Sequence, residues 1–224
     1  MSDEPVEDKS APLDEELSER GILFVVSSPS GGGKGTLIRR ILPQVPRLGY
    51  SVSWTTRPPR TGEQHGVHYF FVTPEEFTAA RTRDEFLEWA VVHGHYYGTS
   101  RTVVERELAC GRDVILEIDV QGAASVRQLP LDSVGIFILP PSYEVLRVRL
   151  IARKSESLDD LALRLRNART EIEHYREFDY VVLNDEVERA SAQLASIVYA
   201  ARAERHRQET LTQRVLASFP EPTP

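Results

Sequence analysis

Residues 28–36 read Ser28-Pro29-Ser30-Gly31-Gly32-Gly33-Lys34-Gly35-Thr36, and this stretch decides the fold of the 224-residue chain. The run before it, residues 21–27, is continuously apolar, which is typical of a strand buried on both faces. Helical periodicity follows, over residues 34–42. Glycines between a strand and a helix let backbone N–H groups turn towards an anion, and the helix N-terminus adds partial positive charge. The motif therefore predicts a phosphate-binding loop in which Lys34 supplies the cation.

The loop departs from the common pattern G-x-x-x-x-G-K-[ST] at two positions. Ser28 stands where the first glycine is expected, and Gly35 follows the lysine. The hydroxyl side chain comes one residue later, so Thr36 is our candidate for a direct Mg²⁺ ligand. A flexible glycine-rich turn is the alternative interpretation, and the strand-loop-helix context favours phosphate binding.

The charge of the chain is unevenly distributed. Residues 1–20 carry eight acidic side chains against Lys9 and Arg20, and they hold −6 of the net charge of −7. We expect them to form a disordered acidic tail, with a second tail at residues 211–224 and one domain at 21–210 between them. The near-neutral remainder argues against nucleic acid as a partner, although 24 of the 27 basic residues of the chain are arginines, which could cluster locally.

Apolar runs and cysteine content bear on the location of the protein. The longest apolar runs are far too short to span a bilayer, and no secretory signal is visible. Cys110 is the only cysteine, which excludes an intrachain disulfide and fits a cytoplasmic location. Both a monomer and a homo-oligomer remain open.

Strand and helix signals alternate along the rest of the chain. Further buried strands are predicted at residues 113–119, 134–139 and 178–183, and helices at 101–109, 122–128, 142–152, 158–175 and 186–207. This alternation predicts an α/β fold with a parallel sheet flanked by helices. Residues 50–100 are rich in aromatic, Thr, Gly and Pro residues, with strand-like pieces at 50–54 and 68–72 and a helix beginning near Pro74. We interpret them as an inserted subdomain.

Several motifs resemble one known family. The Gly-Lys-Gly-Thr form is similar to nucleoside monophosphate kinases, and residues 51–63, SVSWTTRPPRTGE, resemble the S-x-T-T-R-x-x-R-x-G-E signature of guanylate kinases. Further matches follow in order, among them FLEWA at 86–90, GHYYGT at 94–99, LEIDVQG at 116–122 and FDYVVLN at 178–184. The similarity covers about residues 21–205.

The resemblance implies an activity and an architecture. The reaction would transfer the γ-phosphoryl group of ATP to GMP, and to dGMP, with Mg²⁺. The fold would be a P-loop NTPase-type core (21–49, 101–141 and 171–210) with an inserted α+β GMP-binding subdomain (50–100) and a helical lid (142–170).

The acceptor phosphate needs cationic donors. Arg57 and Arg60 flank Pro58-Pro59 and can form a rigid clamp, because planar guanidinium groups bind phosphate through two hydrogen bonds. The resemblance adds the hydroxyls of Tyr69 and Tyr97. Without the resemblance, core packing is the better interpretation of these two tyrosines.

The acceptor base constrains a second group of residues. Guanine presents N1–H and N2–H₂ donors, which a carboxylate matches and which adenine lacks. Glu88 is the expected reader, and the alternative interpretation is an exposed acid at a helix end. Glu117 is the second candidate, at a position where aspartate is more usual. The hydroxyls of Ser53 and Thr99 can assist at guanine O6.

Phosphoryl transfer depends mainly on positioning and charge neutralisation. The resemblance implies ATP binding by residues 28–36 and Asn184, with Lys34, Arg57, Arg153 and Arg164 as the catalytic cations. Arg149 and Arg166 are weaker candidates. Asp119 ends a predicted strand at the edge of the sheet where ligands bind, and it is expected to orient a Mg²⁺-bound water or Lys34.

Two other functions stay open at this point. One is a related kinase that phosphorylates a sugar phosphate such as ribose bisphosphate, which would not need Glu88 and Ser53 as base readers. The other is a catalytically silent guanylate-kinase-like module that binds a phosphorylated partner. Gly33-Lys34 and the lid arginines favour the enzyme.

Overall fold

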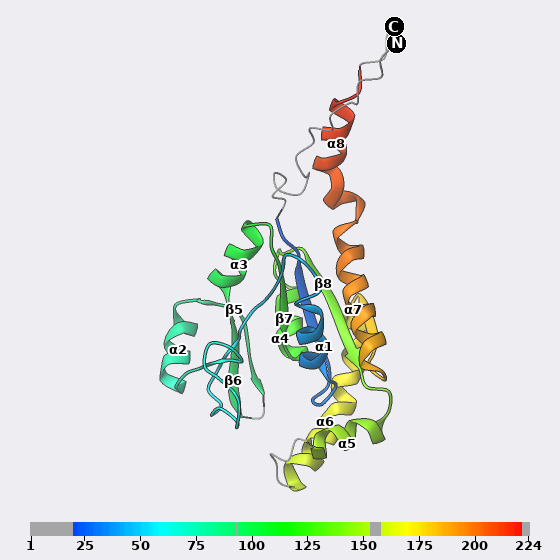
Figure 1. Ribbon diagram of the computed structural model, residues 1–224. Coiled ribbons are helices and arrows are strands. Elements are labelled where there is room, and N and C mark those ends of the chain that lie inside the picture. Colours follow the sequence, from blue (N-terminus) through cyan, green and yellow to red (C-terminus); the bar gives the residue numbers. More distant parts are fainter. Residues whose placement is uncertain (1–19, 93, 153–157, 221–224) are drawn as a thin grey trace.

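The computed structural model describes residues 20–92, 94–152 and 158–220 (Figure 1). Within this part of the chain, five parallel strands form the central sheet in the order β2-β7-β1-β8-β9. They are β1 (Leu23–Ser27), β2 (Leu48–Tyr50), β7 (Asp113–Glu117), β8 (Ser133–Leu139) and β9 (Tyr180–Leu183). The predicted α/β fold with a parallel sheet is confirmed.

Helices cover both faces of this sheet (Figure 1). Phe24 and Val26 of β1 point to one face, where α1 (Lys34–Ile41) and α7 (Val187–Arg202) complete a buried cluster. Leu23 and Val25 point to the other face, against α3 (Arg101–Ala109) and α4 (Val120–Arg127). Since side chains alternate along a strand, a continuously apolar strand such as β1 needs a helical layer on each side.

A second sheet stands beside the first (Figure 1). Its order is β4-β3-β6-β5, formed by β3 (Trp54–Thr55), β4 (Phe70–Phe71), β5 (Phe86–Val92) and β6 (His95–Ser100). Helix α2 (Pro74–Thr82) begins with a capping box at Thr73 and Glu76, and it buries Phe77 against this sheet. The sequence analysis did not identify β5 and β6.

Two helices lie at the end of the core where β1 leads into the phosphate loop (Figure 1). They are α5 (Tyr143–Ala152) and α6 (Leu158–Glu173), which share a small cluster formed by Leu146, Leu150 and Ala168. A short turn, η1 (His174–Glu177), connects α6 to β9.

The C-terminal part differs from the sequence-based expectation. The helix predicted over 186–207 ends at Arg202, and η2 (Arg205–Gln208) and α8 (Glu209–Ala217) follow it. Arg202 donates to Asp113 Oδ2 at 2.7 Å and to the Pro46 carbonyl at 2.7 Å, which fixes this end of α7 to the sheet. Residues 211–217, expected in a tail, belong to α8, which buries none of its side chains. Residues 1–19, which make up nearly all of the expected acidic tail, lie outside the described residues.

No helix within the described ranges is both long enough and apolar enough to cross a membrane.

Candidate functional site

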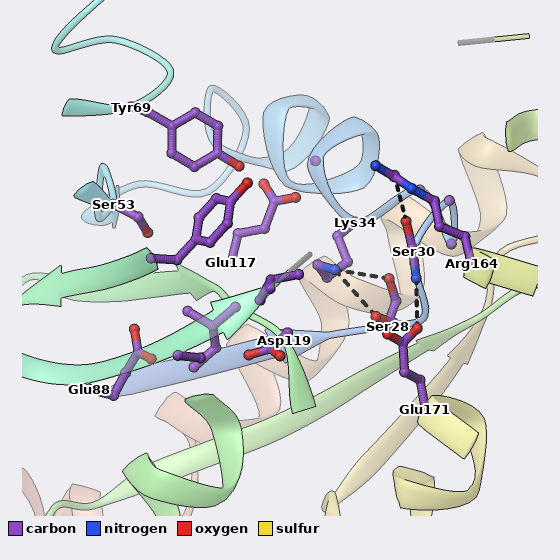
Figure 2. A pocket seen from close by; sticks show the side chains of 18 of the residues that line it. Ser28, Ser30, Lys34, Ser53, Tyr69, Glu88, Glu117, Asp119, Arg164 and Glu171 are labelled. Atoms are coloured by element: carbon purple, nitrogen blue, oxygen red, sulfur yellow. Dashed lines mark hydrogen bonds between the residues drawn. The ribbon is translucent and has the colours of Figure 1, made fainter. Parts of the chain in front are cut away.

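A cavity of about 190 Å³ opens where the carboxyl ends of β1 and β7 face the second sheet. The phosphate loop forms one side, the second sheet forms the opposite side, and α6 contributes from the third (Figure 2). Ligands of open α/β sheets bind at this edge, beyond the carboxyl ends of the strands. The predicted site residues that line the cavity are Ser28, Ser30, Gly31, Gly32, Gly33, Lys34, Gly35, Ser53, Arg60, Tyr69, Glu88, Tyr97, Glu117, Asp119 and Arg164.

The phosphate loop is shaped by Gly33. This residue caps α1 in the left-handed region, at φ 92°. A Cβ atom there would lie 2.3 Å from Asn184 Nδ2, so both the conformation and the space favour glycine. Asn184 is buried and donates to the Gly32 carbonyl at 2.8 Å. It therefore supports the loop from behind, rather than from inside the cavity.

Lys34 begins α1 and bends back over the start of the loop (Figure 2). Its Nζ lies 3.2 Å from Ser28 Oγ and 3.4 Å from the Ser28 carbonyl oxygen. The ammonium group thus lies inside the curve of the loop, where an anion would meet it. Thr36 is exposed on the first turn of α1, and Pro29, within the loop, is buried.

Helix α6 contacts the loop through two side chains (Figure 2). Glu171 Oε2 accepts from the Ser30 N–H at 3.0 Å, and Arg164 Nη1 donates to Ser30 Oγ at 3.2 Å. Arg164 and Glu171 are seven residues apart, which places them on one face of a helix. Sequence reasoning assigned Arg164 to the site but missed Glu171, and this spacing was the available signal. Arg153 lies outside the described residues.

Arg57 is held by an ion pair. Its guanidinium makes two hydrogen bonds with the Glu63 carboxylate, each 2.9 Å, and its Nε donates to the Tyr97 hydroxyl at 3.3 Å. Burial alone would lower the pKa of Arg57, but the hydrogen bonds with Glu63 and Tyr97 raise it above its usual value. The same pair, with the Arg60 N–H, outweighs burial and lowers the pKa of Glu63.

Glu63 was another residue missed by the sequence analysis. It lies in the quoted signature, six residues after Arg57, and it orients Arg57 and the Arg60 backbone together. The Arg57 guanidinium also lies 5.3 Å from the ring centroid of Tyr69, so the acceptor-side residues form one connected group.

Glu88 lies at the opposite end of the cavity from the loop (Figure 2). Glu88 is only 5% exposed and belongs to β5, so the alternative interpretation as an exposed acid at a helix end is wrong. Thr99, its cross-strand neighbour on β6, donates its hydroxyl to Glu88 Oε1 at 2.5 Å. Burial raises the pKa of Glu88 to about 7, while the Thr99 hydrogen bond lowers it and the charge of Asp119 raises it.

Glycine at position 122 makes room for this carboxylate. A Cβ atom on Gly122 would lie 2.5 Å from Glu88 Oε2 and 3.4 Å from Asp119 Oδ1. The first turn of α4 therefore packs directly against Glu88. Asp119 caps that turn, because its Oδ1 accepts from the Gly122 N–H at 3.0 Å.

Comparison with known proteins gives a consistent answer. A family model described as guanylate kinase matches residues 20–201. The guanylate kinase of Polaromonas sp. (strain JS666) is 52% identical over 182 residues, which cover 81% of this chain and 88% of that protein.

The chain belongs to the guanylate kinase family. The guanylate kinase of Rhizobium meliloti (strain 1021) is 48% identical over 200 residues, covering 89% of this chain and 91% of that protein. The crystal structure of guanylate kinase from Anaplasma phagocytophilum has a TM-score of 0.74 at 33% identity, covering 91% of this chain and 98% of that chain. The family therefore accounts for the whole described core.

The described residues offer few ligands for a metal ion. Among the described residues, no group of three or more His, Cys, Asp or Glu side chains could hold a metal ion. Mg²⁺ keeps several waters and takes one or two protein oxygens besides substrate phosphates, so the oxygen-bearing side chains around the loop fit it. The candidates that line the cavity are Glu117 and Asp119, whereas Thr36, on the first turn of α1, is not part of the lining.

Proposed function

We propose that this protein transfers the γ-phosphoryl group of ATP to GMP, and to dGMP, giving ADP and GDP. One observation carries the proposal: a buried carboxylate, Glu88, faces a phosphate loop across a single cavity. The loop suits a nucleoside triphosphate, and the carboxylate suits a base that presents two N–H donors. Membership of the guanylate kinase family supports the same assignment.

We propose that Glu88 reads the guanine edge. A carboxylate can accept from N1–H and N2–H₂ together, whereas adenine would leave it facing a lone pair. Thr99 holds the carboxylate in place, and Ser53, a buried residue that also lines the cavity, can donate to O6. The polar mismatch with adenine would supply discrimination.

The GMP phosphate would be held by the acceptor-side group. Arg60, Tyr69 and Tyr97 line the cavity and can donate directly. Arg57 is already paired with Glu63, so its charge is partly compensated, and its hydrogen bond to Tyr97 orients that hydroxyl. Burial raises the pKa of Tyr69, and the charge of Glu117 raises it further. Tyr69 would therefore bind the phosphate as a neutral donor.

The donor side would hold ATP through residues 28–36. Backbone N–H groups of the glycines and the Lys34 ammonium would contact the phosphates, while Asn184 keeps the loop in shape. Arg164, with Arg153, would neutralise charge on the transferring group. When bound, Mg²⁺ would neutralise the phosphate oxygens, with Thr36 and Asp119 as the sequence-based candidates for its ligands.

We keep two further predictions as proposals. Residues 142–170 would act as a lid whose closure excludes water from the reaction. The protein would work in the cytoplasm, where its nucleotide substrates are found, with no nucleic-acid or membrane partner.

The test is ADP formation with each of GMP, dGMP and ribose bisphosphate as acceptor. GMP-dependent turnover is expected, together with its loss in Lys34→Met, because methionine removes the cation and keeps the side-chain length. Turnover on ribose bisphosphate alone would favour the sugar-phosphate kinase. Absence of turnover on all three would favour the silent binding module.

A further inference from the structure

The side chain of Glu117 lies between Tyr69 and Lys34 in the site (Figure 2). Its Oε2 and Oε1 atoms would lie 3.1 and 3.2 Å from a Cβ atom at Gly35. The carboxylate therefore occupies the space beside residue 35, which carries no hydroxyl in this chain. Glu88, by contrast, lies against the first turn of α4.

The alternation of β7 explains this placement. Tyr50 is aligned with Ile115 in the parallel pair β2-β7, and Glu117 follows Ile115 by two residues. Side chains two apart on a strand share a face, so Glu117 and Tyr50 both project towards the face covered by α1. Ile115 belongs to the cluster that α1 completes, which agrees with this assignment.

A hydrogen bond joins the two side chains. The Tyr50 hydroxyl donates to Glu117 Oε2 at 3.3 Å, and the Tyr50 ring packs against the buried cluster under α1. Tyr50 is thus a fixed donor anchored in the core.

We propose that Tyr50 is a positioning residue that holds the Glu117 carboxylate over Gly35, where Glu117 serves the ATP–Mg²⁺ side of the reaction and not the guanine side. The inference rests on the proposed function, and it replaces the sequence-based expectation that Glu117 is a second reader of the base. Glutamate reaches one methylene further than aspartate and has more rotamer freedom, so it gains more from a donor that fixes it. Partners that orient a ligating carboxylate in this way affect metal affinity without touching the metal.

The experiment compares Tyr50→Phe with the unmodified protein by titration calorimetry. Phenylalanine keeps the packed ring and removes only the donor. We expect the affinity for Mg·ADP to fall about tenfold. The affinities for ADP in EDTA and for GMP without metal should change by no more than about twofold, as is usual for a substitution that removes no direct contact with the ligand. Tyr199→Phe is the matched control, since Tyr199 is an exposed residue of α7 whose hydroxyl donates only one long hydrogen bond, 3.4 Å, to the Gln44 carbonyl.

A second variant tests whether Tyr50 acts through Glu117. Glu117→Gln should weaken Mg·ADP binding at least as much, and the double variant should lose no more than Glu117→Gln alone. Unchanged Mg·ADP binding in Tyr50→Phe, weakened GMP binding in either variant, or additive losses in the double variant would each overturn the inference. Turnover of the unmodified protein with GMP is measured separately, so a failure of the proposed function would be seen there and not in these titrations.

Discussion

The Thr99 hydroxyl and the Glu88 carboxylate face each other across neighbouring strands, 2.5 Å apart between Oγ1 and Oε1. Thr99 is fully buried and Glu88 nearly so. A charge placed in such surroundings is costly unless it is paired, and one hydroxyl donor compensates only part of that cost. The site therefore holds a carboxylate that is incompletely satisfied until a ligand with two N–H donors arrives.

Replacing Glu88 by Gln should damage GMP use far more than ATP binding. The amide keeps the shape but puts a donor where an acceptor is needed, and each lost charge-assisted hydrogen bond costs about 1.5–3 kcal/mol. We expect kcat/KM for GMP to fall roughly 100-fold or more, with the KM for ATP within about threefold. Glu75→Gln, an exposed position on α2, is the control.

Steady-state kinetics with each substrate varied in turn provide the measurement. Equal losses for GMP and ATP would contradict a role for Glu88 at the base.

GMP binding should be coupled to proton release near neutral pH. Burial raises the pKa of Glu88 to about 7, so a fraction of the free protein carries a neutral Glu88 at pH 7. Guanine donors favour the ionised form, and binding should expel that proton. Calorimetry at pH 7 in buffers of different ionisation enthalpy measures the number of protons released. The GMP phosphate also contributes to this number, and subtracting the value for Glu88→Gln removes that contribution. An identical proton count in both proteins would count against this coupling.

The same raised pKa predicts how stability changes with pH. A carboxyl whose pKa is higher in the folded state contributes stability that is complete below the unfolded value and is lost as the pH rises through the folded value. For Glu88 this loss falls between about pH 4.5 and about pH 7. In ligand-free protein, urea unfolding should therefore show a flatter pH dependence over this range in Glu88→Gln than in the unmodified protein.

Gly122→Ala should impair GMP use although alanine is the better helix former. A Cβ atom 2.5 Å from Glu88 Oε2 must displace that carboxylate or the first turn of α4. The gain of about 1 kcal/mol in helix propensity is then outweighed by the clash, and we expect a higher KM for GMP. Gly49→Ala is the matched control, because a Cβ atom at that position would make an ordinary 3.4 Å contact with the Asp113 carbonyl. A normal KM in Gly122→Ala would show that the carboxylate has room to move.

Glu63→Gln should loosen the acceptor side. Losing the two-point pair with Arg57 should lower the free energy of unfolding by about 1–3 kcal/mol and reduce kcat/KM for GMP. Because the pKa of Glu63 is lowered in the folded state, its contribution is present at neutral pH and is lost as the pH falls. Chemical unfolding at pH 7 and pH 4 measures this, and a constant difference between the two proteins would contradict the assignment.

Local signals explain what the sequence predicted well. The phosphate loop depends on nine consecutive residues between a strand and a helix, and each step is set by neighbours in the chain. The parallel sheet followed from strand and helix alternation for the same reason. Predictions of this kind need no knowledge of distant contacts.

Non-local contacts explain what the sequence could not give. The contact between Glu171 and Ser30 joins residues 141 positions apart. The burial of Glu88 depends on how β5 pairs with β6 and on α4 packing against it, and the strands β5 and β6 were not identified. Tyr50 and Glu117 meet only because β2 and β7 are adjacent in the sheet. Strand order and helix docking had to be known before these relationships could be seen.

The most direct test of the central claim is the ratio of kcat/KM for GMP to that for AMP, measured by ADP formation. A site built to hydrogen-bond guanine donors should favour GMP by about 10⁴-fold or more, and the ratio should fall by about 100-fold or more in Glu88→Gln, where the discriminating acceptor is gone. A ratio near 1 in the unmodified protein, or one that survives in Glu88→Gln, would contradict the account.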